Sequence, residues 1–154
     1  MTDLSLKYIL RIRELFIELV NGLSIEALNE IPEGFNNNIA WNFGHSIIST
    51  QGLCYLRSGV QPAMEIPLVE KYRKGSRPES FISKAEIDDL KAQAIAYLDQ
   101  IKNDLASDRF KNITPYSTAT FSYEMNTIEE VITCCLAHET LHYGYALALT
   151  KRLK

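Results

Sequence analysis

Residues 127–154 read TIEEVITCCLAHETLHYGYALALTKRLK, and this stretch predicts a long C-terminal helix. Thr127 followed three residues later by Glu130 is a capping box, in which each side chain satisfies a free backbone amide at the helix start. Gly144 is the one Gly or Pro from Ile128 to Lys154, so we expect the helix to run over this range. The basic residues expected at its negative dipole end are Lys151, Arg152 and Lys154.

Three further helices are predicted upstream. From Leu4 to Val20, charged residues recur every three or four positions, which is typical of an amphipathic helix. The apolar run Ile39–Arg57 follows three asparagines that can cap its start. Ser83 and Glu86 form a second capping box, from which an apolar stripe continues to Leu105. The apolar face expected for the first of these helices comprises Ile9, Ile12, Phe16 and Leu19.

Four such helices without strand alternation predict an all-α four-helix bundle that occupies residues 1–154 as a single domain. The connection over residues 59–83 is long enough to cross the whole bundle, so the two middle helices are expected to be parallel. Long connections often carry function. Residues 113–123 are interpreted as loop, with room for a short extended piece.

The composition excludes several classes of protein. Of 154 residues, 46% are hydrophobic and 23% charged, as in an ordinary globular protein. The net charge is −3 and no dense run of Lys and Arg is present, so we expect no nucleic-acid partner. The longest uncharged stretch, residues 35–56, is too polar to cross a membrane. Because the first residues do not resemble a signal peptide and the three cysteines suit reduced thiols, we expect a cytoplasmic protein.

The sequence contains three histidines, and their spacing predicts a metal site. His138 and His142 are four residues apart, so both imidazoles project from one face of the last helix and can bind one ion. A third ligand is needed, and His45 in the second predicted helix is the remaining imidazole. The alternative for each histidine is a hydrogen-bonded residue of the core or surface.

Residues 138–142 also match the H-E-x-x-H motif of zinc peptidases, in which Glu139 would be the general base. A peptidase is disfavoured, because the 12 residues after His142 include no His, Asp or Glu and the sequence offers no strands to bind a peptide. Glu139 stays a candidate catalytic base for other chemistry, with an interhelical contact as the alternative.

Several neighbours of the histidines are weaker candidates. Trp41 either walls the site or belongs to the core. Cys134 and Cys135 lie about one turn before His138, where a buried structural role is favoured over metal ligation. Four residues of the long connection are candidates for binding an anion, although charged loop residues are usually only solvated, and we leave them out of the site: Tyr72, Arg73, Lys74 and Arg77.

The pentapeptide Trp41-Asn42-Phe43-Gly44-His45, combined with His138-Glu139-Thr140-Leu141-His142-Tyr143-Gly144, resembles the DinB-like (YfiT-like) family of metal-binding four-helix bundles. The resemblance covers nearly the whole chain in the order of its elements. It implies an up-down-down-up bundle, one divalent ion (nickel, zinc or iron) held by the three histidines, and a homodimer. The sequence departs from the pattern at Tyr145, where many members have Gln.

The resemblance also suggests a reaction class. Some members resemble transferases that use a low-molecular-weight bacterial thiol, and others are assigned only provisionally as hydrolases. Three neutral imidazoles leave the ion its full double charge, which favours activation of water or a thiol for attack on a small-molecule substrate. The alternatives are a non-catalytic dimeric bundle, with a structural metal or none, and the disfavoured peptidase.

Overall fold

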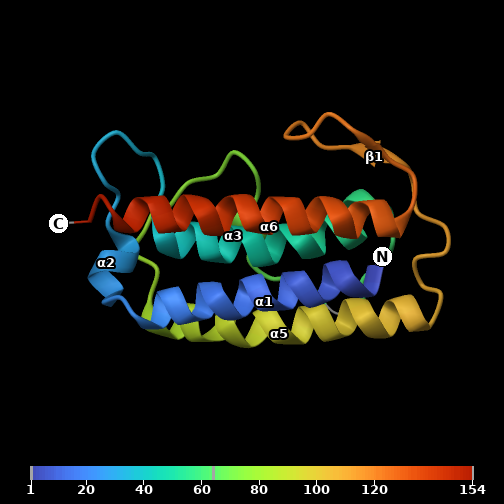
Figure 1. Cartoon of the computed structure of the whole chain (residues 1–154), viewed down its shortest axis with the longest axis horizontal. Coiled ribbons are helices and arrows are strands. Elements are labelled where there is room, and N and C mark those ends of the chain that lie inside the picture. The colour runs from blue at the N-terminus through green and yellow to red at the C-terminus, as the bar shows by residue number, and fades with distance from the viewer. Residues whose placement is uncertain (1, 64, 154) are drawn as a thin grey trace.

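The computed structural model describes residues 2–63 and 65–153. Four long helices lie side by side and form a bundle (Figure 1). They are α1 (Thr2–Asn21), α3 (Ile39–Gln51), α5 (Lys84–Ala106) and α6 (Ile128–Thr150). The π-helix η1 (Gly52–Arg57) continues α3, so the predicted helix over residues 39–57 is confirmed with a wider final section. No helix in the described ranges combines the length and apolar character needed to cross a membrane.

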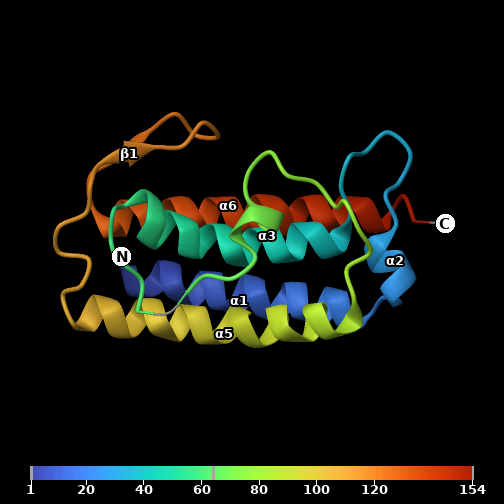
Figure 2. The same ribbon diagram turned by 180° about the vertical axis from the view of Figure 1, so that it is seen from behind.

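The directions of the helices confirm the predicted all-α bundle and its up-down-down-up order. The colour sequence shows that α1 runs in one direction, α3 and α5 run in the opposite direction, and α6 returns (Figures 1 and 2). The two middle helices are therefore parallel. A parallel pair needs a connection that spans the bundle, and the segment between η1 and α5 supplies it.

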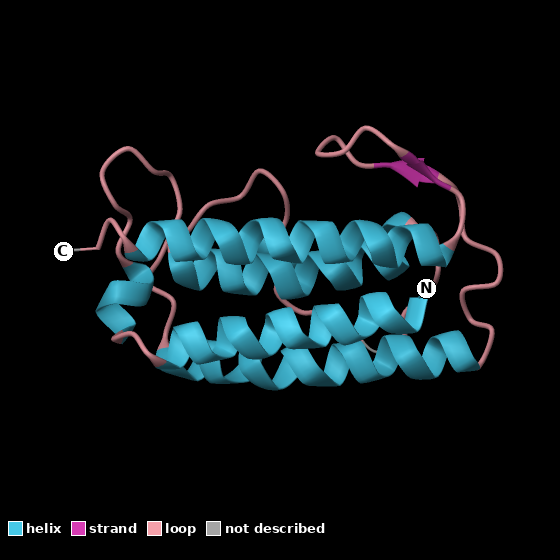
Figure 3. Cartoon of the chain, viewed as in Figure 1, coloured by secondary structure: helices cyan, strands magenta, loops and turns pink. Residues whose placement is uncertain are grey.

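Shorter elements, among them the two strands shown in Figure 3, lie outside the four long helices. They are α2 (Ile25–Asn29), α4 (Val69–Tyr72), β1 (Tyr116–Ser117) and β2 (Glu124–Met125). Residues 113–123 are mostly loop with a short extended piece, as predicted: β1 pairs with β2 in an antiparallel hairpin with Tyr116 opposite Met125. Strands of two residues and helices of one turn are too short to produce a recognisable period in the sequence.

The predicted helix starts are confirmed by their caps. The Thr127 hydroxyl accepts a hydrogen bond from the amide of Glu130, and the Glu130 carboxylate accepts one from the amide of Thr127, which completes the capping box of α6. Asn38, the last of the three asparagines, accepts from the amide of Trp41 at 2.8 Å. This cap fixes the start of α3, which carries the central residues of the site.

At the start of α5 only half of the predicted capping box forms. The Ser83 hydroxyl accepts from the amide of Glu86, but the Glu86 carboxylate turns to the long connection. There it accepts hydrogen bonds from Lys71 Nζ at 2.6 Å and from the Tyr72 hydroxyl at 2.5 Å. The first turn of α5 therefore anchors α4 against the bundle.

The expected end of α6 is wrong by one turn. The helix ends at Thr150, Lys151 is its C-cap and Arg152 lies beyond it. Neither Lys151 nor Arg152 therefore lies within the last turn of the helix. Lys154 lies outside the described residues. Leu149 is the last buried residue of α6, and Leu153 beyond the helix end is partly buried against the same hydrophobic cluster.

The inward face of α1 differs from the predicted stripe. Its buried residues are Leu6, Ile9, Arg13, Phe16 and Val20. Ile12 and Leu19 are only half-buried, because the face that meets the bundle is rotated toward Arg13. A charged residue at a core position breaks the apolar pattern on which the stripe was based.

Arg13 is buried because it has a buried partner. Its guanidinium donates to both carboxylate oxygens of Glu139 on α6, at 2.6 Å from Nη2 and 3.0 Å from Nε. A third donor, Nη1, binds the carbonyl oxygen of Ala94 on α5 at 2.5 Å. Thr50 on α3 donates to the same carboxylate at 2.6 Å. The pair is therefore fully hydrogen-bonded and links all four long helices.

Candidate metal centre

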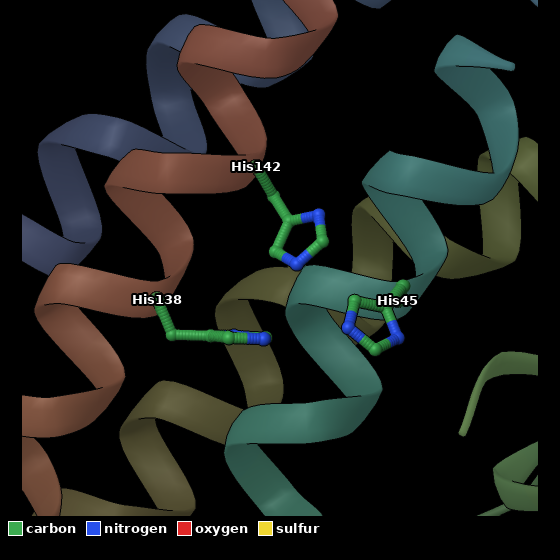
Figure 4. Close-up of side chains that lie close together, drawn as sticks. All are labelled: His45, His138 and His142. Carbon is green, nitrogen blue, oxygen red and sulfur yellow. The ribbon is translucent and has the colours of Figure 1, made fainter. Parts of the chain in front are cut away.

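The structure brings the three histidines together. His45 lies in the middle of α3, while His138 and His142 lie one turn apart on the facing side of α6 (Figure 4). One side-chain nitrogen from each ring lies within 4.8 Å of the other two. Residues almost a hundred positions apart in the chain meet here because α3 and α6 pack against each other along their length.

His45 is held in one tautomer by the long connection. Its Nδ1 lies 2.5 Å from the carbonyl oxygen of Tyr72, and a carbonyl can only accept, so Nδ1 carries the proton and donates it. The lone pair of His45 is then on Nε2, the nitrogen that a metal would use. The Ser49 hydroxyl lies 3.3 Å from Nδ1 and adds a second polar contact to the ring.

A hydrogen bond to Asn42 fixes the tautomer of His142 in the same way. The amide nitrogen of Asn42 donates to the carbonyl oxygen of Asn38 at 2.8 Å and to Oδ1 of Asn37 at 3.2 Å. This assigns the amide orientation, so the remaining oxygen accepts from His142 Nδ1 at 2.8 Å. The lone pair of His142 is likewise left on Nε2.

His138 completes the group in a different way. Its Nδ1 is buried and has no hydrogen-bond partner in residues 2–63 and 65–153. A buried polar atom without a partner is rare in folded proteins and needs an explanation. A ring with one buried nitrogen that the protein leaves without a partner, beside two rings whose lone pairs are directed, fits a site that is completed by a ligand.

The surroundings keep all three imidazoles neutral, which is the form that binds a metal. Burial lowers the pKa of His138 to about 4, with smaller contributions from the charges of His45 and Lys74. Burial and the two neighbouring imidazoles lower the pKa of His142 to about 3. The pKa of His45 is also lowered by burial, against the hydrogen bond to Tyr72 and with a small effect from Lys74.

The donor set fits a divalent transition metal. The centre of a triangle with 4.8 Å sides lies about 2.8 Å from each corner, and small side-chain rotations shorten this to the roughly 2.0–2.1 Å of a zinc–imidazole bond. Three imidazole nitrogens suit nickel, zinc and iron and are a poor match for calcium or magnesium, which prefer oxygen. Three ligands also leave positions open for other molecules.

Beside the three histidines lies a cavity of about 720 Å³. Its walls come from α3 and η1, from residues 72–75 of the long connection, from residues 117–121 of the hairpin loop, and from α6. Figure 1 shows that the long connection and the hairpin loop lie on the same side of the bundle. The cavity is large enough for a small organic molecule, and all three histidines line it.

Trp41 lines the cavity and supports the site directly. Its ring stacks on that of His45, with centroids 4.6 Å apart and an angle of 14° between the planes. The indole nitrogen donates to the carbonyl oxygen of Lys71 and to the hydroxyl of Ser76, both at 3.3 Å. Both interpretations of Trp41 therefore apply, because the residue lines the cavity and also belongs to the hydrophobic core.

Glu139 lies away from the cavity, although it is adjacent to His138 in sequence. It projects from another face of α6, is 1% exposed, and is bound by Arg13 and Thr50. It is not among the residues that line the cavity. The geometry fits the interhelical contact and gives the catalytic role of Glu139 no support.

Cys134 and Cys135 differ in whether they line the cavity. Cys134 lines the cavity, and burial raises the pKa of its thiol to about 11. Cys135 is fully buried beside Cys54 in an apolar cluster, against which Cys134 is partly buried. Among the described residues, the group of possible metal ligands contains histidines and no cysteine.

Sequence reasoning missed the two residues that orient the rings, Asn42 and Tyr72. Asn42 lies three positions before His45, so the two share a helix face, and this spacing was the available signal. Tyr72 acts through its backbone carbonyl, which no side-chain motif can reveal.

The comparisons with known proteins address the family. The family model described as the DinB superfamily matches residues 8–146, which includes all four long helices in whole or large part and the three histidines. The comparison with proteins of curated function gives no match. The predicted resemblance is thus confirmed by a match over most of the sequence, and the chain belongs to the DinB superfamily.

Proposed function

We propose that this protein holds one divalent transition-metal ion at His45, His138 and His142 and uses it to activate a nucleophile for reaction with a small-molecule substrate. The nucleophile is water or a low-molecular-weight thiol, so the protein is a hydrolase or a thiol transferase. The observation that carries the proposal is the convergence of three imidazoles from two helices on the wall of a cavity. The ion is nickel, zinc or iron.

The chemistry follows from the donor set. When bound, a divalent cation with three neutral ligands keeps its full charge and lowers the pKa of water or a thiol at its open positions, so that either is a nucleophile near neutral pH. The protein's own residues direct the ring lone pairs to one point through Tyr72 and Asn42. The cavity supplies the space in which a substrate reaches that point.

Two observations favour this proposal over its alternatives. A purely structural metal would be enclosed by protein ligands, whereas these three histidines line an open cavity. An H-E-x-x-H peptidase needs the Glu carboxylate beside the ion, whereas Glu139 is held by Arg13 on another face of α6.

Elemental analysis of the protein purified without a histidine tag tests the metal site. We expect about one equivalent of nickel, zinc or iron per chain and, after reconstitution, loss of tight binding in His142→Ala. Thr140→Ala is the matched control, because Thr140 lies on the same helix, is exposed and binds only the carbonyl oxygen of Leu136. Less than a tenth of an equivalent after reconstitution contradicts the proposal.

Two assays on the metal-loaded protein separate the nucleophiles. An aromatic ester reports attack by water, and an aryl halide with added cysteine reports thiol transfer, in which the thiolate replaces halide and a proton is released. We expect turnover in one of the two assays that His142→Ala abolishes and Thr140→Ala preserves. Full metal occupancy without turnover of any ester, amide or aryl halide tested favours the structural alternative.

A further inference from the structure

The charges around the cavity are of one sign. Arg57, Arg73 and Lys74 line it, and no Asp or Glu of the described residues does. The whole chain has 19 acidic and 16 basic residues, so a wall with cations alone does not reflect the average composition. Such a wall raises the local concentration of anions and disfavours cations.

Lys74 is the cation best placed to meet a ligand. Its ammonium has no carboxylate within 4.0 Å and no hydrogen-bond partner in the part of the chain that the structure describes. It lies on the segment that follows α4, which forms the wall beside His45. Its charge also acts on His45 and His138, which places it within electrostatic range of the candidate metal centre.

Arg57, the last residue of η1, is held in position. Its Nη2 donates to the carbonyl oxygen of Ser117 at 3.1 Å, and its guanidinium lies over the ring of Tyr116, 5.2 Å from the centroid. These contacts fix the side chain and occupy no carboxylate, so further N–H donors stay available. Arg73 differs, because it forms a surface ion pair with Glu70. We assign it no role.

The rest of the cavity wall is largely apolar. Leu56, Phe121 and Leu141 are 50%, 43% and 53% exposed although they line it. Large apolar side chains at the mouth of a cavity stabilise the apolar part of a ligand by removing both surfaces from water. The wall therefore offers an apolar surface and unpaired cations beside the same three histidines.

We propose that this site takes an organic anion with an apolar portion as its substrate. Lys74 and Arg57 bind the anionic group, a carboxylate, while the apolar portion contacts Leu56 and Phe121 and the reacting group lies at the histidines. This inference rests on the proposed function, since it names the substrate class of that same site. A charge-assisted hydrogen bond from either cation selects the anion over a neutral analogue of equal size.

Trp41 provides the readout, because it is the single tryptophan of the chain and lines the cavity. Its fluorescence is titrated with hexanoate, 1-hexanol and hexylamine, which share one apolar chain and differ in charge. Titrations of metal-free and metal-loaded protein distinguish binding of the anion by Lys74 and Arg57 from binding of the anion by the metal ion. We expect hexanoate to bind on the order of ten-fold more tightly than hexanol in both forms, and hexylamine most weakly.

The variants Lys74→Gln and Arg57→Gln test which residues hold the anion. Each is expected to reduce the preference for hexanoate over hexanol several-fold while leaving the affinity for hexanol unchanged. Lys111→Gln is the control, because Lys111 is exposed and does not line the cavity. Equal affinities for the three probes, or a preference that survives in the double variant, overturn the proposal.

These outcomes are distinct from failure of the metal site. Metal content is measured on the same samples, and Lys74→Gln is expected to keep its equivalent of metal. Normal metal content without anion preference refutes the substrate class alone. A preference that occurs only in the metal-loaded protein and is unaffected by Lys74→Gln assigns the anion to the ion and also refutes it.

Discussion

The ring of Tyr72 lies directly against the α-carbon of Gly44, where a Cβ atom would be 2.5 Å from the ring carbon Cζ. No other side chain than hydrogen fits at position 44 without moving this ring. The same Tyr72 accepts the hydrogen bond that fixes the tautomer of His45, one residue after Gly44. The glycine therefore permits the close packing of the long connection that orients a candidate metal ligand.

We expect Gly44→Ala to displace Tyr72, destabilise the protein by about 1–3 kcal/mol and weaken metal binding roughly ten-fold. Gly144→Ala is the matched control, since nothing lies within 4 Å of a Cβ added there. This change should stabilise α6 by about 0.5–1 kcal/mol without affecting the metal. Thermal unfolding and chelator competition measure both effects. Equal metal affinities in the two variants contradict the role given to Tyr72.

The histidines illustrate what the sequence can predict about such a site. His138 and His142 stand at helical spacing and His45 lies in an apolar helix, so residue type and period were sufficient to bring them together as a hypothesis. The partners of the rings could not be predicted in the same way. Tyr72 reaches His45 from an irregular segment, whose path depends on the half-formed capping box at Glu86.

The core shows the same limit. The predicted stripe of α1 assumed that inward positions are apolar, whereas Arg13 occupies one of them. Its place depends on Glu139, 126 residues later, and a pattern within one helix contains no information about that partner. The same pairing explains why Glu139, which sequence adjacency placed near the metal, lies elsewhere.

Glu139→Gln is predicted to act on stability. The change leaves the Arg13 guanidinium buried without a counter-charge, which costs about 3–5 kcal/mol. Metal content should be unchanged. Glu129→Gln, an exposed position in the first turn of the same helix, is the control. Chemical denaturation measures the free energy of unfolding.

A double variant keeps this prediction testable if Glu139→Gln folds poorly. Replacing Arg13 by Met and Glu139 by Leu removes both charges, and we expect it to recover most of the lost stability. Wild-type stability in Glu139→Gln, combined with loss of turnover, would instead favour the role of general base.

The buried imidazoles should make the metal-free protein less stable in mild acid. The pKa values of His138 and His142 are lowered to about 4 and about 3, against 6.5 in an unfolded chain. Between pH 6.5 and 4 the unfolded chain therefore binds protons that the folded protein does not, and stability falls as the pH falls. We expect the Tm of chelator-treated protein to decrease by several degrees over this range.

The variant His138→Gln with His142→Gln shows whether the histidines cause this slope, because it should make the decrease smaller. The exposed carboxylates Asp3 and Asp88, whose pKa values are lowered by lysine partners, lose their contribution only below about pH 4. The titration of these two carboxylates therefore lies outside the measured range of pH 6.5 to 4. An equal slope in the variant and the wild type contradicts the assignment.

Asn42 provides the sharpest test of how the rings are oriented. Asn42→Ala removes the acceptor for His142 Nδ1, so the ring is free to change tautomer, and we expect metal affinity to fall about 10–100-fold. Asn42→Asp keeps an acceptor at the same distance and should retain near wild-type affinity. It should nevertheless lose stability, because the donors to Asn38 and Asn37 are gone and a charge is buried.

Chelator competition and thermal unfolding on the same samples separate the two properties. Asn36→Ala is the control, since Asn36 is exposed and precedes the cap of α3. If the hydrogen bond orients the ligand, metal affinity depends on the acceptor oxygen at position 42, whereas stability depends on the amide donors. Asn42→Asp then has the metal affinity of the wild type and the reduced stability of Asn42→Ala. Affinity that is equally weak in both variants would mean that Asn42 acts only through the packing of α3.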